Sequence, residues 1–514
     1  MRLVRGLALP RRDWWFVLAG AALAVLAYPP FHLLVPSFVC LVPAVWLLHA
    51  GAADPRPIRR HVVQGFWFGL LTQGAVLYWM VVALWHFTPL SLLGYAATIT
   101  ILALYTGVLF GVTGQILRRT GLPLVAVFPV FWTALEWWVG HQGDIAFPWL
   151  GLGTSLTGYP TLVQIADIVG ARGVTFLLTA ANVTIGVTWL RRREPGAAWR
   201  LLAVSLGVLA ALAYGTWRER TIAVRTVGTV GLIQPNVGFD EKWETGATRE
   251  IFADLLRLSQ DVLAAGDPAI IFWPEAAVPA WFPSRDPSYE RRIGALARES
   301  GVPLFVGGVH VERTGPGRED YDYWNAGFAY DTTGSRDRHP VYHKRYLVPI
   351  TERVPFVNPR WFKLRFFGAF AVGERGEVYD LGPGRFGVII CYESAFEDLP
   401  RRYRALGADY VANITNDAWF GETAAPRQHL AHLVMRAIEN RVGIARAANT
   451  GISGFVDPLG RIYDRTRLGE RRFVIGDVRT TDVRTLYTRM GDWVGLLSLV
   501  GTGALLLGLV RRRR

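Results

Sequence analysis

The sequence predicts two kinds of fold in one chain: a polytopic α-helical membrane domain and an α/β domain. Long apolar blocks with almost no charge fill the first 217 residues, and a further block closes the chain. From about residue 226, short β-rich segments alternate with polar segments of helical pattern, which is typical of a layered α/β domain. We therefore expect a membrane domain over 1–217, an α/β domain over 218–491, and a last transmembrane helix with a basic tail over 492–514.

The apolar blocks predict the number of membrane crossings. A helix needs about 20 apolar residues to cross the hydrocarbon core of a bilayer. On that basis eight spans are expected, over 14–31, 33–51, 62–85, 90–117, 123–139, 172–190, 199–217 and 492–510. The first block lacks a small-residue cleavage site and runs directly into the second, so it is expected to be a span and not a signal peptide.

Arginine placement predicts the orientation of these spans. Arginines gather near the N-terminus, in alternate loops and at the C-terminus, whereas the loops around 29–36, 86–90 and 140–160 contain no lysine or arginine. Loops rich in positive charge stay on the cytoplasmic side. Both termini are therefore expected in the cytoplasm, and the α/β domain outside, in the periplasm of a bacterium with two membranes. Glu136, near the outer end of the fifth span, is expected at the interface.

Charge and cysteine content narrow the function. The net charge of +14 lies largely in the cytoplasmic loops, and no nucleic-acid-binding motif is present, so no nucleic-acid partner is expected. Of the two cysteines, Cys40 lies in an apolar block and Cys391 in the α/β domain. A lone thiol in an oxidising compartment has no disulfide to form within its domain. This favours a chemical role for Cys391 over that of a small buried hydrophobic residue.

The elements of the α/β domain follow from its hydrophobic pattern. Strands are expected at 229–234, 269–273, 304–309, 326–330, 386–391, 410–414, 444–447 and 454–457. Helices are expected at 247–265, 287–300, 396–406 and 426–441. A segment of this length is enough to enclose one hydrophobic core.

Three of the expected strands end near titratable side chains. Cys391 ends the apolar segment that begins at Phe386, Glu275 follows Trp273-Pro, and Lys344 lies in Tyr342-His-Lys. A thiol nucleophile needs a base to take its proton, and the oxyanion formed on acyl attack needs a cation or N–H donors. Glu275, Lys344 and Cys391 could supply these roles. Taken singly, Glu275 could also be a helix-terminal acid and Lys344 a surface lysine.

Histidines offer another partner for the thiol. His310, His343, His429 and His432 all lie in the α/β domain, so a Cys–His pair is an alternative. However, His429 and His432 fall on the expected helix 426–441, and no Cys-centred motif surrounds Cys391. No ligand spacing typical of a metal site is present, so no metal is expected.

The ordered set of motifs resembles a known family. Glu275, Lys344 and Cys391 resemble the triad of the nitrilase superfamily, which is carried by an α-β-β-α sandwich. Together with the membrane spans they resemble the apolipoprotein N-acyltransferases of bacterial inner membranes, and the resemblance covers essentially the whole chain. The supporting segments are Gln234-Pro-Asn-Val237, Lys242-Trp243, Trp273-Pro-Glu275, Tyr323-Trp-Asn-Ala326, Tyr342-His-Lys344, Leu347-Val-Pro349, Cys391-Tyr-Glu393, Asn416-Asp-Ala-Trp-Phe-Gly421 and Ala448-Asn-Thr-Gly451.

The resemblance implies acyl transfer in two steps without a cofactor. Glu275 would take the thiol proton while Cys391 attacks the sn-1 ester of a phospholipid. Lys344 and the backbone N–H after the cysteine would hold the oxyanion. The thioacyl-enzyme would then pass its chain to the α-amine of a diacylglyceryl-cysteine lipoprotein, in ping-pong order.

The resemblance also implies supporting residues in the site. These are Trp243, Asn325, Glu352, Tyr392, Glu393 and Trp419. Packing would explain the two tryptophans equally well, a turn cap would explain Asn325, and both Glu352 and Glu393 could orient Lys344. The segment Ile350-Thr351-Glu352 departs from the Phe-Gly-Glu more usual in the family, so we expect a changed loop shape with the glutamate retained.

A lipid donor requires an apolar entrance to the site. Burying one CH₂ stabilises by about 0.8 kcal/mol, so a chain of about 16 carbons exposed to water would cost on the order of 10 kcal/mol. The segment 356–370 mixes aromatic and cationic residues, Trp361 and Phe362 among them. We expect it to dip into the outer leaflet as a lid or gate; packing against its own domain is the alternative.

Two other functions compete with N-acyl transfer. A membrane-tethered amidase or nitrilase would use the same triad with water as the acceptor, but a small soluble substrate would not require eight spans and an apolar gate. A transporter-like bundle with a degenerate outer domain would not need to retain all three triad residues.

Overall fold

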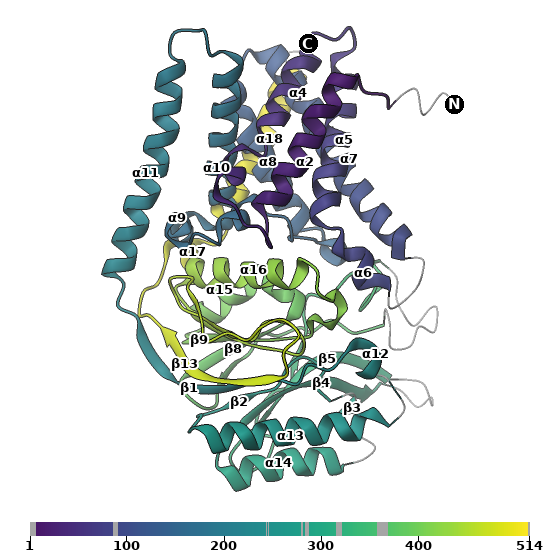
Figure 1. Ribbon diagram of the computed structural model, residues 1–514, viewed down its shortest axis with the longest axis vertical. Coiled ribbons are helices and arrows are strands. Elements are labelled where there is room, and N and C mark those ends of the chain that lie inside the picture. The colour runs from purple at the N-terminus through teal and green to yellow at the C-terminus, as the bar shows by residue number, and fades with distance from the viewer. Residues whose placement is uncertain are drawn as a thin grey trace. The chain divides into compact units, whose positions relative to one another are not determined.

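The computed structural model describes residues 7–85, 91–242, 244, 246–278, 281–282, 287–314, 321–356 and 369–511. The chain forms two compact units. The first comprises Met1–Gln142, Ala146–Arg220 and Met490–Arg514, and the second comprises Gly143–Ile145 and Thr221–Arg489. Each unit is considered by itself (Figure 1).

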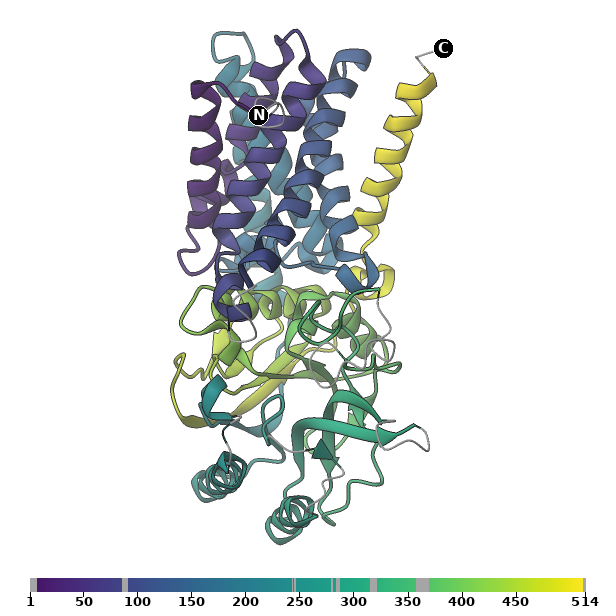
Figure 2. The same cartoon turned by 90° about the vertical axis from the view of Figure 1, so that its right-hand side faces the viewer.

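The first unit is helical. Its helices are α2 (Arg11–Ala27), α3 (Leu34–Val39), α4 (Val42–Ala52), α5 (Pro57–Val76), α6 (Trp79–Trp85), α7 (Ser91–Thr120), α8 (Leu124–Gly140), α9 (Pro160–Val163), α10 (Ala166–Leu190), α11 (Ala197–Thr221) and α18 (Trp493–Arg511). The short helix α17 (Leu486–Met490) leads into α18. Figure 2 shows α18, drawn yellow, running along the bundle and ending at the same end as the start of α2.

A helix lies within each of the eight expected membrane spans. Within the described part of the chain, five helices are long and apolar enough to cross a membrane, or six if α5 and α6, which meet at a 60° bend, form one span. The helices α2 and α8 have 17 residues each, at the lower limit of the roughly 17–25 residues that a span requires. The predicted polytopic membrane domain is confirmed.

Polar side chains inside this unit bind one another. Glu136 accepts hydrogen bonds from Trp132 Nε1 at 3.0 Å, Leu152 N at 2.9 Å and Thr175 Oγ1 at 2.8 Å. It is half-buried and ties α8 to α10 and the intervening loop, whereas the sequence suggested a solvated position at the interface.

The sixth expected span begins close to the expected residue 172. The helix α10 is assigned from Ala166, but Gly170 has a non-helical backbone with a φ of 68°, so the continuous helix begins after it. The charged residues near this break are paired within the unit. Asp167 binds Arg218 at 2.8 Å, and Arg172 binds Asp492 at 3.2 Å.

The second unit is a sandwich of two sheets. The larger sheet has the order β13-β1-β2-β4-β5-β6, with β3 paired to β4, and the smaller has the order β12-β11-β10-β9-β8-β7. The strands are β1 (Arg225–Gln234), β2 (Ile271–Phe272), β3 (Trp281–Phe282), β4 (Leu304–Arg313), β5 (Tyr321–Tyr330), β6 (Tyr342–His343), β7 (Val378–Asp380), β8 (Arg385–Ile390), β9 (Tyr410–Thr415), β10 (Gly443–Ala448), β11 (Gly454–Val456), β12 (Ile462–Tyr463) and β13 (Arg472–Thr480).

Helices cover the outer faces of this sandwich. The helices α13 (Ala247–Ala265) and α14 (Ser288–Ser300) pack on the larger sheet, and α15 (Asp398–Ala405) and α16 (Ala425–Asn440) pack on the smaller one (Figure 1). Between the sheets lies an aromatic core: Phe386 of β8 contacts Phe272 of β2 at 5.3 Å and Phe305 of β4 at 5.7 Å between ring centroids. The predicted α-β-β-α sandwich is confirmed.

Candidate active site

The three predicted triad residues lie together in the second unit, although each follows a different strand. Glu275 follows β2, Lys344 directly follows β6, and Cys391 directly follows β8. The amine Nζ of Lys344 lies 3.3 Å from Glu275 Oε1 and 2.9 Å from Glu352 Oε1. The side chains of Glu275, Lys344, Glu352 and Cys391 are all buried. The charges of Glu275 and Lys344 both act on the Cys391 thiol, so a cation paired with carboxylates lies near the cysteine of this unit.

Cys391 occupies a sharp turn between a strand and a helix. The buried strand β8 ends at Ile390, and a 3₁₀ helix begins at Cys391 and runs to Ala395. The φ angle of Cys391 is 51°, a left-handed conformation that is costly for a residue with a Cβ and that clusters at functional sites. The surrounding contacts must hold the nucleophile in this conformation.

Electrostatics keep the resting sulfur protonated and the lysine charged. Burial and the negative charge of Glu275 raise the pKa of the Cys391 thiol, and the positive charge of Lys344 opposes them only in part. Burial alone would lower the pKa of Lys344, but Glu275 and Glu352 outweigh it and raise the pKa above its ordinary value. The thiol therefore needs a base when it reacts, and Lys344 remains a cation.

One side-chain amide and two backbone N–H groups fix the carboxylates around Lys344. Asn325 Nδ2 donates to Glu275 Oε1 at 2.6 Å and to Glu352 Oε1 at 2.8 Å. The other oxygens accept backbone bonds: Glu275 Oε2 from Asn416 N at 2.8 Å, and Glu352 Oε2 from Val348 N at 2.7 Å. Asn325 therefore bridges the two acids and does not cap a turn.

Glu393 connects the cysteine turn to the lysine segment. Its Oε2 accepts from Ile390 N at 2.6 Å and Tyr342 Oη at 2.7 Å, and its Oε1 accepts from Arg345 N at 2.6 Å. Burial raises the pKa of Glu393 to about 7, although these donors act in the opposite direction. Glu393 thus acts on the backbone around Lys344, whereas Glu352 binds the amine itself.

The loop before Glu352 contains a strained residue. Ile350 adopts a φ of 72°, which is strained for a β-branched residue, and its side chain is 54% exposed. Glu352 contacts Lys344. The carboxylate therefore reaches the amine from this strained turn.

The remaining predicted residues divide into packing positions and positions outside the described chain. Tyr392 is buried and packs edge-on against Phe396 at 5.2 Å between ring centroids. Trp419 packs against Phe239 at 5.0 Å. Trp243 lies outside the described residues, as does most of the expected gate, 357–368, including Trp361 and Phe362.

Three of the four histidines contact groups other than the thiol of Cys391. His310 Nδ1 and His343 Nε2 lie 2.8 Å apart and bond to each other. On α16, His429 directs Nε2 at the backbone oxygen of Cys391, 2.9 Å away. Sequence reasoning assigned no role to this contact, because the histidine lies 38 residues beyond the cysteine and no local motif joins them.

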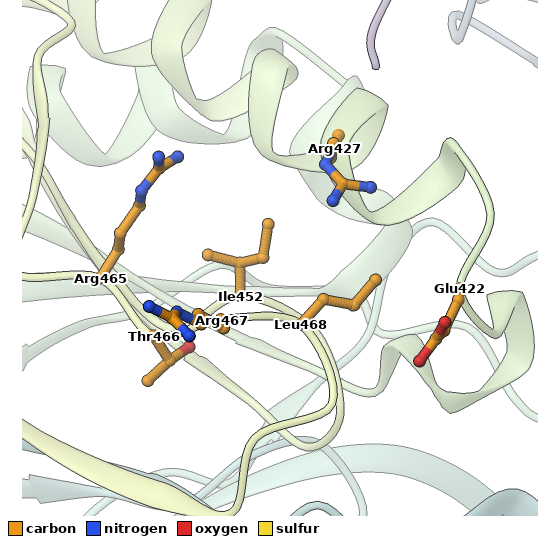
Figure 3. A pocket seen from close by; sticks show the side chains of 7 residues that line it. All are labelled: Glu422, Arg427, Ile452, Arg465, Thr466, Arg467 and Leu468. Atoms are coloured by element: carbon orange, nitrogen blue, oxygen red, sulfur yellow. The ribbon is translucent and has the colours of Figure 1, made fainter.

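Two further features of this unit were not expected from sequence. Lys242 is 3% exposed, and burial lowers its pKa to about 8 despite the opposing charge of Glu275. A pocket of about 390 Å³ carries three arginines and one glutamate (Figure 3). Its lining residues are Glu422, Arg427, Ile452, Arg465, Thr466, Arg467 and Leu468. The triad is not among these residues, so this pocket is separate from the candidate active site.

Comparison with known proteins identifies the family. Residues 229–487 match the carbon-nitrogen hydrolase family, and residues 20–184 match the apolipoprotein N-acyltransferase N-terminal domain. An apolipoprotein N-acyltransferase of Geobacter metallireducens is 34% identical over 99% of this chain and 97% of its own length. The chain belongs to the apolipoprotein N-acyltransferase family. A second apolipoprotein N-acyltransferase, from Rhodopseudomonas palustris, is 32% identical over 97% of this chain and 94% of its own length.

Membership of the apolipoprotein N-acyltransferase family confirms the predicted resemblance. The protein is a multi-pass membrane enzyme of the nitrilase superfamily, and N-acyl transfer is supported over the amidase alternative. Among solved structures, an amidase of Nesterenkonia from the nitrilase superfamily aligns with a TM-score of 0.38 and 18% identity, over 53% of this chain and 95% of that chain.

Proposed function

We propose that this acyltransferase moves a fatty acyl chain from a phospholipid to the N-terminal amine of a diacylglyceryl-cysteine lipoprotein, through a thioester on Cys391. The observation that carries the proposal is the contact of Lys344 Nζ with Glu275 and Glu352, beside a buried thiol held at a strained turn. A base, a cation and a nucleophile are the parts that acyl transfer through a thioester requires.

In the first step the thiol takes the acyl chain. Glu275 accepts the proton of Cys391 while the sulfur attacks the carbonyl carbon of the sn-1 ester. Lys344 and the N–H of Tyr392 stabilise the tetrahedral oxyanion. An ammonium has three N–H donors, and two of those of Lys344 point to Glu275 and Glu352. The C–O bond then breaks, Glu275 returns its proton to the leaving oxygen, and a lysophospholipid departs.

In the second step an amine takes the chain from sulfur. The N-terminal amine attacks the thioester carbonyl and loses a proton to Glu275. The same oxyanion donors act again, the C–S bond breaks, and the sulfur leaves with that proton. The products are an amide on the lipoprotein and the free Cys391 thiol, which is ping-pong order. No cofactor takes part in these steps.

The reaction is placed at the outer face of the bacterial inner membrane. We assign residues 1–217 and 492–514 to the membrane and 218–491 to a periplasmic catalytic domain. The arginine distribution supports cytoplasmic termini. The start of α2 and the end of α18 also lie at one end of the helical bundle (Figure 2).

Intact-mass analysis tests the first step. Purified protein given phospholipid without an acceptor is expected to gain the mass of one acyl chain, removable by hydroxylamine. Cys391→Ser cannot form a thioester, so it should gain no adduct that hydroxylamine removes. Any acyl ester on the serine oxygen would resist the same treatment. Free fatty acid without any adduct on the protein would favour a hydrolase and overturn the proposal.

A further inference from the structure

His429 is a buried side chain of α16 that contacts the nucleophile through its backbone. Its Nε2 lies 2.9 Å from the carbonyl oxygen of Cys391, and its Nδ1 lies 2.9 Å from Asp417 Oδ1. The side chains of His429 and Asp417 are both fully buried. The ring therefore joins the cysteine turn to a charged group in the interior of the domain.

Two of the groups at the ring nitrogens are hydrogen-bond acceptors. A carbonyl oxygen can only accept, and Asp417 is ionised: burial alone would raise its pKa, but Arg446 and His429 lower it to about 2. A neutral imidazole has only one N–H, whereas two acceptors at 2.9 Å take two. Both acceptors are therefore satisfied when His429 is an imidazolium that donates from both nitrogens.

Arg446 shares the carboxylate with the ring. Its Nη2 donates to Asp417 Oδ2 at 2.7 Å, so the arginine and the histidine occupy the two oxygens of one carboxylate. The same Nη2 lies 3.3 Å from His429 Nδ1, a longer contact than either nitrogen makes with Asp417. Thr415 Oγ1 also donates to Asp417, at 3.1 Å. Burial, Arg436 and His429 lower the pKa of His432, on the same helix, well below its ordinary value.

We propose that His429 is a positioning residue that holds the turn at Cys391 and polarises the peptide bond between Cys391 and Tyr392. This proposal rests on the proposed function, in which the N–H of that same peptide holds the oxyanion. A cationic donor on the carbonyl draws electron density toward its oxygen and makes the N–H across the peptide bond a stronger donor. The positive charge of His429 thus reaches the reacting atoms through one peptide group.

The same contact secures the strained backbone. Cys391 has a φ of 51°. Two buried side chains bind the backbone of the turn, one just before Cys391 and one at Cys391. Glu393 accepts from Ile390 N before it, at 2.6 Å, and His429 donates to the carbonyl of Cys391 itself. Asp417 and Arg446 in turn fix the position and charge of the imidazolium, with Arg446 Nη1 donating to Asn413 Oδ1 of the neighbouring strand at 2.5 Å.

The thioester carbonyl reports directly on this polarisation. Full-length enzyme is acylated with phospholipid labelled with ¹³C at the ester carbonyl, without acceptor, and the carbonyl stretch of the acyl-enzyme is recorded by infrared difference spectroscopy. His429→Leu removes the donor, His429→Gln keeps a neutral one, and His432→Gln is the control because it changes a buried histidine of the same helix. The acylation rate is measured in parallel.

In the wild type and in His432→Gln the carbonyl stretch should lie at the same low frequency. It should rise in His429→Leu and take an intermediate value in His429→Gln. The acylation rate should fall by about 10- to 100-fold in His429→Leu with KM nearly unchanged, less than the loss of a direct oxyanion donor. Partial rescue by glutamine separates the electrostatic role from a packing role.

Two different failures remain distinguishable. If the wild type forms no thioester, the proposed function is wrong and this inference is wrong with it. If the wild type is acylated and both His429 variants retain its carbonyl frequency, the polarisation of the peptide by His429 is wrong while the thioester mechanism stands.

Discussion

Lys344 is the residue through which the charges of the site are balanced. Its amine lies between Glu275 and Glu352 at 3.3 and 2.9 Å, and Asn325 joins the same two carboxylates. Because these acids raise the pKa of Lys344, the cation persists in a buried setting that would otherwise favour the neutral amine. The proposed oxyanion site therefore depends on the acid partners of the lysine as well as on the lysine itself.

Glu352→Gln tests this balance. Removing one negative charge should lower the pKa of Lys344, so the loss of activity at high pH should begin at a lower pH than in the wild type. We expect kcat at neutral pH to fall by about 10- to 100-fold, less than the roughly 100- to 1000-fold that removal of an oxyanion donor costs. The measurement is the pH profile of acylation. Glu312→Gln, a substitution of an exposed glutamate on β4, should leave the profile unchanged, and an unshifted alkaline limb in Glu352→Gln would refute the assignment.

Glu393 should make stability depend on pH. Its pKa is raised from 4.5 to about 7 by burial, so the folded protein holds a proton that the unfolded chain releases near pH 4.5. Stability from this group is therefore fully present below about pH 4.5 and declines as the pH rises to about 7, by at most about 3 kcal/mol. Melting temperatures of Glu393→Gln in detergent should lack this decline. An identical slope in mutant and wild type would contradict the shift.

At this scale the sequence predicted the reacting groups and, through the family resemblance, the supports Asn325, Glu352 and Glu393. Glu275, Lys344 and Cys391 follow strands whose apolar pattern is legible, so their proximity could be expected. The contact of His429 with Cys391, and that of Asn416 N with Glu275, depend on segments 38 and 141 residues away. They arise where helix α16 packs on the turn at Cys391 and where the segment after β9 meets the segment after β2, which no local pattern encodes.

At the scale of elements, the ends of two adjacent strands fix the position of Glu275, the proposed general base. A Cβ on Gly307 of β4 would overlap the carbonyl oxygen of Pro274 and lie 2.8 Å from Glu275 Cα. Glycine therefore allows β4 to pass close beside the segment that carries the carboxylate. This close approach makes the placement of Glu275 sensitive to a single methyl group.

Gly307→Ala should displace Glu275 and reduce acylation. The overlap involves backbone atoms that cannot rotate away, so we expect a loss of about 1–3 kcal/mol in stability together with reduced kcat. Gly238→Ala is the matched control, since its nearest neighbour, Glu241 Oε2, lies at an ordinary contact distance of 3.6 Å. Both variants are compared by thermal melting and by acylation rate. A melting temperature and an acylation rate of Gly307→Ala equal to those of the wild type would contradict this prediction.

The elements missed by the sequence analysis are mostly short or half-exposed. All eight expected strands and all four expected helices of the α/β domain are present. The strand β13 was not expected, although it pairs with β1 along nine residues. Its outer position in the sheet leaves several residues partly exposed, with charged residues at both ends of the strand, which masks the apolar pattern. The strands β3, β6 and β12 have two residues each, too few for any periodicity.

At the scale of the whole molecule, the proposed orientation can be tested by labelling. Arg193 lies in a loop expected in the cytoplasm, and Arg467 lies in the domain expected in the periplasm; both are exposed. A membrane-impermeant maleimide applied to intact spheroplasts should label Arg467→Cys and not Arg193→Cys. The native Cys40 and Cys391 are buried and should contribute little background.

Permeabilised cells provide the control, because both introduced cysteines should then react. Labelling of Arg193→Cys in intact spheroplasts would place that loop outside and reverse the proposed topology.

The most direct test of the mechanism is a chase of the isolated acyl-enzyme. Enzyme labelled on Cys391 with a radioactive acyl chain is freed of phospholipid and mixed with a synthetic diacylglyceryl-cysteine peptide. The proposed mechanism predicts that the label leaves the protein and appears as an amide on the peptide, resistant to hydroxylamine. Label that stays on Cys391, or that appears only as free fatty acid, would contradict the claim that this sulfur carries the chain from lipid to amine.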